Sequence, residues 1–268
     1  MLENKTAVVT GGASGIGAAI CAELAKKKCK ILIADIDVDN ATEVASKLNS
    51  MTQVIVEQTD STDPESVARA VNKCVQEWGT IDYIFNNAGI ALKGDVLDTS
   101  LQDWDRLTDI NIRGVVHGVH AAYPIMVEQG HGHIVNTASL AGLMPSPSNT
   151  AYAMTKSAVV GLSNSLRCEA KRFGVKVSVV CPGLIDTPIV KSMKVVTGKS
   201  DLQGAHMTAE DCATDIIKGV EKDRAVIPVS KLAHIMYRLN RHFPNFTLGL
   251  MMASVKKNNF LRPLPESE

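Results

Sequence analysis

The amino-acid sequence predicts an α/β fold: a single doubly wound domain with a seven-stranded parallel sheet and helices on both faces. Short apolar runs rich in β-branched residues alternate with amphipathic helical patterns over almost the whole length, as strand–helix–strand units do. The runs are nearly all apolar, which is typical of strands buried on both faces, and neither a long polar linker nor an internal repeat separates them. The predicted strands are residues 6–10, 30–35, 52–57, 82–86, 133–138, 176–181 and 225–229.

Three of the intervening helices have recognisable start signals. Pro64 follows Asp63 and suits a first-turn position in a helix. Ser100 and Thr208 each stand three residues before an aspartate. This spacing resembles a capping box in which aspartate replaces the usual Glu or Gln. We therefore expect a helix to begin at each of these signals.

Two segments depart from the alternating pattern. Residues 184–207 lack a clear period and contain Pro188, Gly198 and Gly204, so we expect a mobile segment there, between the sixth strand and the next helix. Residues 231–268 hold six Lys or Arg against two Glu, interspersed with Met, Leu and Phe. We expect this basic and apolar C-terminal extension to pack on the same domain or on a neighbouring subunit. The alternative is an apolar lid or a peripheral contact with a membrane surface.

The composition argues against several classes of protein. Lys plus Arg and Asp plus Glu both total 28, whereas nucleic-acid-binding proteins usually have a basic excess. The sequence contains no run of 18 uncharged apolar residues, so no transmembrane helix is predicted. The N-terminus enters a strand-like segment almost at once, which leaves no room for a signal peptide. We expect a cytoplasmic protein that binds no nucleic acid.

The cysteines and histidines do not predict a metal site. Six cysteines are scattered without a C-x-x-C pair, so they fit neither a zinc site nor a disulfide framework. We expect most of them to be small apolar core residues. His117 and His120 stand three apart on a helical pattern, but a buried or interface role suits them better than metal binding.

A glycine-rich turn follows the first predicted strand and opens the first helix. Residues 10–17 read TGGASGIG, with Gly11, Gly15 and Gly17 allowing a tight turn, a close approach of backbone to a pyrophosphate, and close helix–strand packing. The amides and dipole at the helix start favour phosphate groups. The turn and its position predict a dinucleotide site.

Asp35, at the end of the second predicted strand, predicts which dinucleotide. A carboxylate there can accept hydrogen bonds from the adenosine ribose hydroxyls and would repel a 2′-phosphate. Ser14 and Ile36 nearby supply no positive charge, so NAD is preferred over NADP. The alternative is that Asp35 caps the turn into the next helix, which Asp37 or Asp39 could also do.

Residues 151–156 read AYAMTK, so Tyr152 and Lys156 lie one turn apart on the same face of a helix. Taken alone, this pair could be solvated, or the amine could make the phenol easier to deprotonate. Further along, Pro182 and Gly183 follow the sixth strand, and NNAG at 86–89 ends the fourth.

In this order and spacing, the motifs resemble the short-chain dehydrogenase/reductase family over about residues 5 to 230. The resemblance implies a Rossmann-type dinucleotide-binding and catalytic domain at 1–230, with 231–268 as an extension. It also implies a catalytic tetrad of Asn111, Ser139, Tyr152 and Lys156. The cofactor-binding residues that the motifs and the resemblance imply are Gly11, Ser14, Gly15, Ile16, Gly17, Asp35, Ile36, Asp60, Asn87, Ala88, Gly89, Tyr152, Lys156, Pro182, Gly183, Ile185 and Thr187.

The resemblance gives each tetrad residue an expected role. Tyr152 acts as general acid/base. Lys156, together with the positive nicotinamide of NAD+, lowers the pKa of Tyr152, and Lys156 also binds the nicotinamide ribose. Ser139 donates a hydrogen bond to the substrate oxygen. Asn111 holds a helix distortion and a water that passes protons from Lys156 to solvent.

These expectations predict an NAD-dependent oxidoreductase that interconverts a secondary alcohol and a carbonyl. We expect residues 184–207 to be the substrate loop. Because they are rich in Val, Met and Ile, a mainly apolar small molecule such as a steroid, retinoid or other lipophilic alcohol is favoured as the substrate. The alternatives are a 3-oxoacyl thioester reductase and a non-catalytic NAD-sensing scaffold. The helices that hold Asn111 and Tyr152 carry broad apolar or small-residue faces, and similar proteins pair them across a twofold axis. We therefore expect a homodimer or homotetramer.

Overall fold

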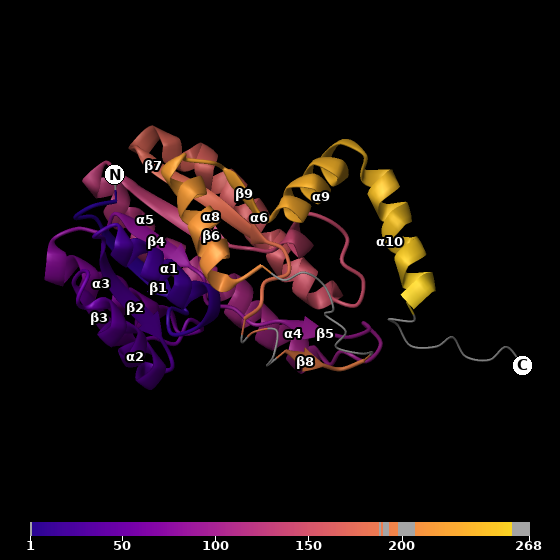
Figure 1. Ribbon diagram of the computed structural model, residues 1–268, viewed down its shortest axis with the longest axis horizontal. Coiled ribbons are helices and arrows are strands. Elements are labelled where there is room, and N and C mark those ends of the chain that lie inside the picture. Colours follow the sequence, from indigo (N-terminus) through magenta and orange to yellow (C-terminus); the bar gives the residue numbers. More distant parts are fainter. Residues whose placement is uncertain (1, 188, 190–192, 198–206, 259–268) are drawn as a thin grey trace, which may run out of the picture.

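The structure of the protein is a computed structural model that describes residues 2–187, 189, 193–197 and 207–258 (Figure 1). Pro188, Gly198 and Gly204 of the predicted substrate loop therefore lie outside the described residues, as do residues 259–268 of the C-terminal extension.

A single seven-stranded sheet forms the centre of the molecule. Every pairing in it is parallel, and the strand order is β3-β2-β1-β4-β6-β7-β9. The chain therefore moves outward from β1 in both directions, and the strand order reverses between β1 and β4. The predicted seven-stranded sheet is confirmed, with strand ends that differ by two residues at most. The strands are β1 Thr6–Thr10, β2 Lys30–Asp35, β3 Val54–Gln58, β4 Tyr83–Asn86, β6 Gly132–Thr137, β7 Val175–Pro182 and β9 Val226–Val229.

Helices cover both faces of the sheet, as predicted. One apolar core lies between the sheet and α1, α2 and α8, and a second lies between the opposite face and α3, α5 and the end of α6. Five of the six cysteines are buried, most of them in these cores. The helices are α1 Gly15–Lys26, α2 Val38–Leu48, α3 Pro64–Trp78, α4 Leu101–Thr108, α5 Gly114–Gln129, α6 Thr150–Ala170 and α8 Ala209–Glu221.

The three predicted helix starts are confirmed by their caps. The Asp63 carboxylate accepts a hydrogen bond from the backbone amide of Glu65, and the Ser100 hydroxyl accepts one from the amide of Asp103. The Thr208 hydroxyl does the same for the first turn of α8. Each cap satisfies an amide that would otherwise lack a partner inside the helix.

The expectation that residues 184–207 lack regular structure is wrong for one short piece. Lys194–Val195 forms the strand β8, which pairs in parallel with β5 at Leu92–Lys93. Alternation over two residues is too short to be recognised in a sequence. The segment is regular because its backbone finds a partner strand about a hundred residues earlier in the chain.

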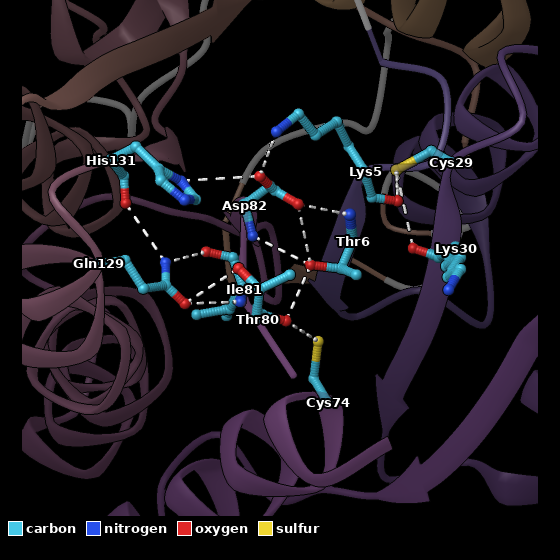
Figure 2. Close-up of polar contacts among 10 residues, drawn as sticks. All are labelled: Lys5, Thr6, Cys29, Lys30, Cys74, Thr80, Ile81, Asp82, Gln129 and His131. Carbon is cyan, nitrogen blue, oxygen red and sulfur yellow. Dashed lines mark hydrogen bonds and ion pairs between the residues drawn. The ribbon is translucent and has the colours of Figure 1, made fainter. Parts of the chain in front are cut away.

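Asp82, just before β4, organises the edge of the sheet where the parallel strands begin. Its carboxylate accepts hydrogen bonds from the Lys5 ammonium at 2.8 Å and the Thr6 amide at 3.0 Å. Gln129 accepts from the Ile81 amide at 3.0 Å, beside this carboxylate (Figure 2). Because every strand is parallel, this network lies at the opposite edge of the sheet from the ends of β1, β2 and β4.

The C-terminal extension begins with α9 (Lys231–His242), which packs against β9, and continues with α10 (Pro244–Asn258), which packs against α9. Figure 1 shows the two helices as a hairpin beside the sheet, with α10 farther from it. Among the described residues, no helix combines the length and the apolar content that crossing a membrane requires.

Candidate active site

A cavity of about 900 Å³ opens at the edge of the sheet where the strands end. In open parallel sheets, ligands bind at this edge, near the point where the strand order reverses. All the predicted cofactor residues except Gly17 line the cavity, and Ser139 lines it too.

The glycine turn forms one wall of the cavity because its backbone is packed too closely for side chains. Gly11 has a φ of +64°, and a Cβ there would lie 2.8 Å from the Cα of Ala88. A Cβ on Gly17 would collide with the carbonyl oxygen of Gly11. Gly17 therefore packs behind the turn, while Gly11 brings the backbone and the start of α1 to the cavity. Such an arrangement of amides suits a phosphate group.

Asp35 joins the end of β2 to this turn. Its carboxylate accepts hydrogen bonds from the Ala13 amide at 2.8 Å and the Asp37 amide at 3.0 Å. The cap of α2 is instead Asp37, which accepts from the Asn40 amide at 3.1 Å. Asp35 therefore holds the turn into α2, as the alternative expected, while Asp37 caps the helix itself. Asp35 also lies on the cavity wall.

Asn87 and Asp60 shape the next part of the wall. The Asn87 amide group donates to the carbonyl oxygens of Thr10 and Gly11 at 3.3 and 3.2 Å, which ties the ends of β1 and β4 together. The Asp60 carboxylate accepts from the backbone amide of Thr62 at 2.8 Å and from its hydroxyl at 2.7 Å. Both contacts hold loops that follow strand ends.

Ser139, Tyr152 and Lys156 come together from two elements. Ser139 follows β6 and caps a short 3-10 helix, Leu140–Gly142, by accepting from the Ala141 amide. Tyr152 and Lys156 lie in the first two turns of α6. The buried Lys156 ammonium donates to the carbonyl oxygen of Thr137 at 3.0 Å and lies 5.7 Å from the centre of the Tyr152 ring.

Burial has the largest effect on the pKa values of Tyr152 and Lys156. Burial raises the pKa of the Tyr152 phenol above its ordinary value, and a hydrogen bond with the Ser139 hydroxyl opposes this effect without overcoming it. Burial also lowers the pKa of Lys156 to about 8. In the protein without cofactor, desolvation of the phenolate therefore dominates. The expected lowering of the phenol pKa depends on the positive nicotinamide of NAD+ as well as on Lys156, and it stays a prediction.

Asn111 lies behind the cavity wall rather than on it. It sits in a π-helical turn, Asp109–Arg113, between α4 and α5. The predicted helix distortion is thus present at this residue. The fully buried Asn111 side chain exchanges two hydrogen bonds with the Ile90 backbone, at 2.9 and 3.0 Å, and donates to the Thr155 hydroxyl at 3.1 Å. It therefore ties the loop after β4 to α6, one residue before Lys156.

The sequence analysis named no individual residues for the part of the cavity outside the cofactor and tetrad positions, although it expected a substrate loop at 184–207 and gave an apolar lid as one alternative for the C-terminal extension. α10 contributes Met251 and Ser254, although it lies about a hundred residues after Tyr152 in the chain. The only signal for this was the apolar content of the C-terminal extension. Further apolar side chains that line the cavity are Met144, Pro145, Pro147, Leu184, Ile189 and Met193.

A family model described as short chain dehydrogenase matches residues 5–195. The chain belongs to the short-chain dehydrogenase family. Its members are oxidoreductases, and the α/β fold with its seven-stranded parallel sheet is the fold of this family.

Similar proteins agree with this assignment. SadH of Mycobacterium tuberculosis, which is named as an oxidoreductase, is 34% identical over 266 residues, covering 95% of this chain and 96% of the relative. An uncharacterized oxidoreductase of Staphylococcus aureus is 38% identical over 189 residues, covering 70% of this chain and 81% of the relative.

Two solved structures of this kind are similar along most of their length. A short-chain dehydrogenase/reductase of Burkholderia phymatum in complex with NAD has a TM-score of 0.83 and 27% identity, covering 98% of this chain and 99% of its own. A 3-ketoacyl-(acyl-carrier-protein) reductase of Brucella melitensis complexed with NADH has a TM-score of 0.76 and 25% identity, covering 84% and 96%.

Proposed function

We propose that this short-chain dehydrogenase is an NAD-dependent enzyme that interconverts a secondary alcohol and a carbonyl, with Tyr152 as general acid/base. The observation that carries the proposal is the convergence of Ser139, Tyr152 and Lys156 on one cavity, which the glycine turn also lines. A phenol and a hydroxyl on the same wall can both reach one substrate oxygen. A buried amine beside them can stabilise the charge that forms when the proton moves.

The proton chemistry follows from the environment of Tyr152. Because burial raises the pKa of the phenol, the phenol is protonated at neutral pH and can donate its proton to a carbonyl oxygen. Ser139 donates a hydrogen bond to that oxygen as negative charge develops on it. When bound, a nicotinamide cofactor accepts or supplies the hydride, and its oxidised ring carries a positive charge that favours the phenolate.

Lys156 and Asn111 support this step. Lys156 has a pKa of about 8, so most of it is charged at pH 7 and attracts the phenolate. We assign to it the ribose hydroxyls of the cofactor as well. Asn111 bonds Ile90 and Thr155 and so fixes the loop and the helix on either side of Lys156. We propose that Asn111 also supports a proton relay from Lys156 to solvent.

The residues of the cavity fit NAD. The packed glycine turn leaves room for a pyrophosphate at the start of α1. Asp35, held by the Ala13 and Asp37 amides, can accept hydrogen bonds from ribose hydroxyls and would repel a 2′-phosphate. Both similar solved structures hold NAD or NADH. These points support NAD over NADP.

The substrate we propose is a mainly apolar alcohol or ketone, such as a steroid, a retinoid or another lipophilic alcohol. The support is the set of methionine, proline, leucine and isoleucine side chains that line the cavity beside the cofactor motifs' residues. A second candidate activity, the reduction of a 3-oxoacyl thioester, is supported by the likeness to the Brucella reductase.

We further propose that residues 1–230 form the catalytic unit and that the extension completes its cavity through Met251 and Ser254 of α10. The small-residue faces of α5 and α6 suit pairing with a second copy, so we propose a homodimer or homotetramer. Five buried, unpaired thiols are consistent with a reducing compartment such as the cytoplasm.

The proposal is tested by steady-state turnover with NADH and NADPH against ketones from short-chain to steroid and retinoid, with acetoacetyl-coenzyme A included. We expect kcat/KM to be at least about tenfold higher with NADH and to rise with the apolar size of the ketone. Asp35→Ser should reduce the ratio of kcat/KM with NADH to kcat/KM with NADPH. Preference for NADPH with the thioester would favour the second candidate. Tight NADH binding without turnover of any compound would favour a sensor.

A further inference from the structure

The C-terminal hairpin, defined as α9 and α10 (residues 231–258), leaves large apolar side chains exposed. Leu232 and Ile235 of α9 are 64% and 61% exposed, and Phe246 and Met252 of α10 are 62% and 59% exposed. Phe243, in the turn between the helices, is 61% exposed. Single exposed apolar residues are ordinary, but a run of them on neighbouring turns indicates a surface that contacts something apolar.

The pattern on α10 shows how little of this helix the rest of the chain covers. Over residues 244–255, whose burial the structure describes, only Thr247 is fully buried, and Met251, one turn later, faces the cavity. Phe246 and Leu250 are one turn apart on one side of this stripe, whereas Leu248 and Met252 lie on the other, all with exposed side chains. A helix that is apolar on most of its faces is expected to lie in apolar surroundings.

The hairpin is nevertheless held firmly on its inner side. The buried Thr247 hydroxyl donates to the side-chain oxygen of Asn240 on α9. The Asn240 amide group in turn donates to the carbonyl oxygen of Leu143 at 2.8 Å. Leu143 lies four residues after Ser139, so a polar chain fixes the hairpin to the cavity wall. The exposed apolar surface is therefore preformed.

The charge of the hairpin indicates what covers this surface. The chain as a whole has equal numbers of basic and acidic residues, yet 231–258 contains no Asp or Glu. Lys231, Arg238 and Arg241 are exposed, and among the described residues no ion pair joins them to a carboxylate. The basic residues of the segment are Lys231, Arg238, Arg241, Lys256 and Lys257.

We propose that the C-terminal hairpin docks the protein on the surface of a bilayer that contains anionic phospholipid. Exposed apolar side chains next to unpaired cations are the features that hold a helix in the headgroup region, where the apolar groups enter the acyl boundary and the cations meet lipid phosphates. A second copy of the same hairpin is disfavoured because it would bring like charges together. This inference does not depend on the proposed chemistry.

Docking in this way would set the cavity beside the lipid. Met251 and Ser254 line the cavity from the same helix that presents Phe246 and Leu250 to the outside. The hairpin would thus separate bilayer from cavity by the width of one helix. An apolar ligand dissolved in the bilayer could then enter without crossing much water.

The test is co-sedimentation of the full chain with vesicles of phosphatidylcholine alone and of phosphatidylcholine mixed with phosphatidylglycerol. We expect binding to the mixed vesicles, weakened by added salt. The double variant Phe246→Glu/Leu250→Glu and the double variant Arg238→Gln/Arg241→Gln should each bind at least about tenfold more weakly. The matched control is Leu101→Glu, at a leucine in the first turn of α4 that is more exposed than either Phe246 or Leu250, and it should bind like the wild type.

Two further measurements keep the proposal testable if a variant folds poorly. Amide hydrogen exchange of the wild type should slow along α10 when the mixed vesicles are added. Light scattering without lipid should give the same mass for the wild type and the variants. The proposal is overturned if the wild type does not bind the mixed vesicles, if Leu101→Glu loses binding as the hairpin variants do, or if the hairpin variants lower the oligomer mass while lipid binding is absent. The last result would assign the surface to a second copy.

Discussion

At the scale of single residues, Gly89 lies close to both Asn111, which supports the site, and Lys156, which takes part in the proposed chemistry. A Cβ at this position would lie 3.0 Å from the side-chain oxygen of Asn111 and 3.3 Å from the ammonium nitrogen of Lys156. Both neighbours are buried and hydrogen-bonded, so an added Cβ would push both Asn111 and Lys156 from their positions.

Gly89→Ala should therefore lower kcat/KM by about tenfold, since a small displacement of a catalytic group is costly. The control is Gly161→Ala on α6, where a Cβ would meet nothing within 4 Å. This substitution should raise the free energy of unfolding by up to about 1 kcal/mol and leave the kinetics unchanged. Steady-state kinetics and urea unfolding of both variants are the measurements. Equal activity in the two would show that Lys156 tolerates the displacement.

Which residues meet at the site could be predicted from the sequence, but not how they interact. Tyr152 and Lys156 share a helix face because of their spacing, and Asp35 ends a strand whose pattern is clear. The direction of the Tyr152 pKa could not be predicted, because it depends on burial by distant segments. For the same reason no local pattern shows that Asn111 bonds Ile90 and Thr155.

At the scale of elements, two contacts hold the segment around Lys194 and Val195 in place. We call them the clasp: the pairing of β8 with β5 and the ion pair of Lys194 with Asp103 on α4. β8 pairs with β5, and next to this pair the Lys194 ammonium contacts both carboxylate oxygens of Asp103 at 2.8 and 3.0 Å. The Lys194 contact, helped by the Ser100 hydroxyl, lowers the pKa of the Asp103 carboxyl. The clasp anchors to α4 the segment that follows Met193 on the cavity wall.

Lys194→Met should raise the KM for the organic substrate several-fold while leaving the dissociation constant of NADH unchanged, because only one wall of the cavity loses its anchor. A suitable control is Lys47→Met, which breaks an exposed ion pair with Glu43 on α2 far from that wall. Kinetics with substrate varied and fluorescence titration with NADH separate the two effects. A KM equal to that of the wild type would show that the clasp does not shape the substrate wall.

The long elements were predictable and the short ones were not. Strands of four to eight residues and helices with caps leave a pattern that local rules recognise. The two-residue strands β5 and β8 and the placement of α10 against the cavity depend on contacts across about a hundred residues. Local sequence carries no record of such contacts.

At the scale of the whole molecule, the stabilising network and the site lie at opposite edges of the sheet. Asp82 and its partners hold the edge where the strands begin (Figure 2), and the cavity lies where they end. Stability and chemistry can therefore be perturbed separately.

Stability should fall in alkaline solution because of the buried cysteines. Burial raises the pKa of Cys74, Cys181 and Cys212 to about 12, and it raises those of Cys21 and Cys29 as well. Above about pH 9 these thiols ionise on unfolding but not in the native state. The unfolded state then holds fewer protons, and each thiol lowers the free energy of unfolding by about 1.4 kcal/mol per pH unit. Burial lowers the pKa of Lys156 in the native state, so its ionisation makes the free energy of unfolding rise with pH. This effect offsets the contribution of about one thiol.

Urea unfolding at pH 8, 9 and 10 measures this slope. Cys74→Ala should reduce this slope by the contribution of one thiol, about 1.4 kcal/mol per pH unit. Cys168→Ala, at the one exposed cysteine, should leave it as in the wild type. A free energy of unfolding that stays constant from pH 8 to pH 10 would show that the buried thiols do not control alkaline stability.

The most direct test of the central claim is single-turnover hydride transfer by Tyr152→Phe. The variant removes the hydroxyl that bonds Ser139 and leaves the glycine turn and Lys156 in place, so the dissociation constant of NADH should change by no more than about twofold. The rate of hydride transfer to a ketone that the wild type reduces should fall by about 10²- to 10⁴-fold, the usual contribution of a positioned general acid. Hydride transfer at the wild-type rate with NADH bound would contradict the role assigned to the phenol.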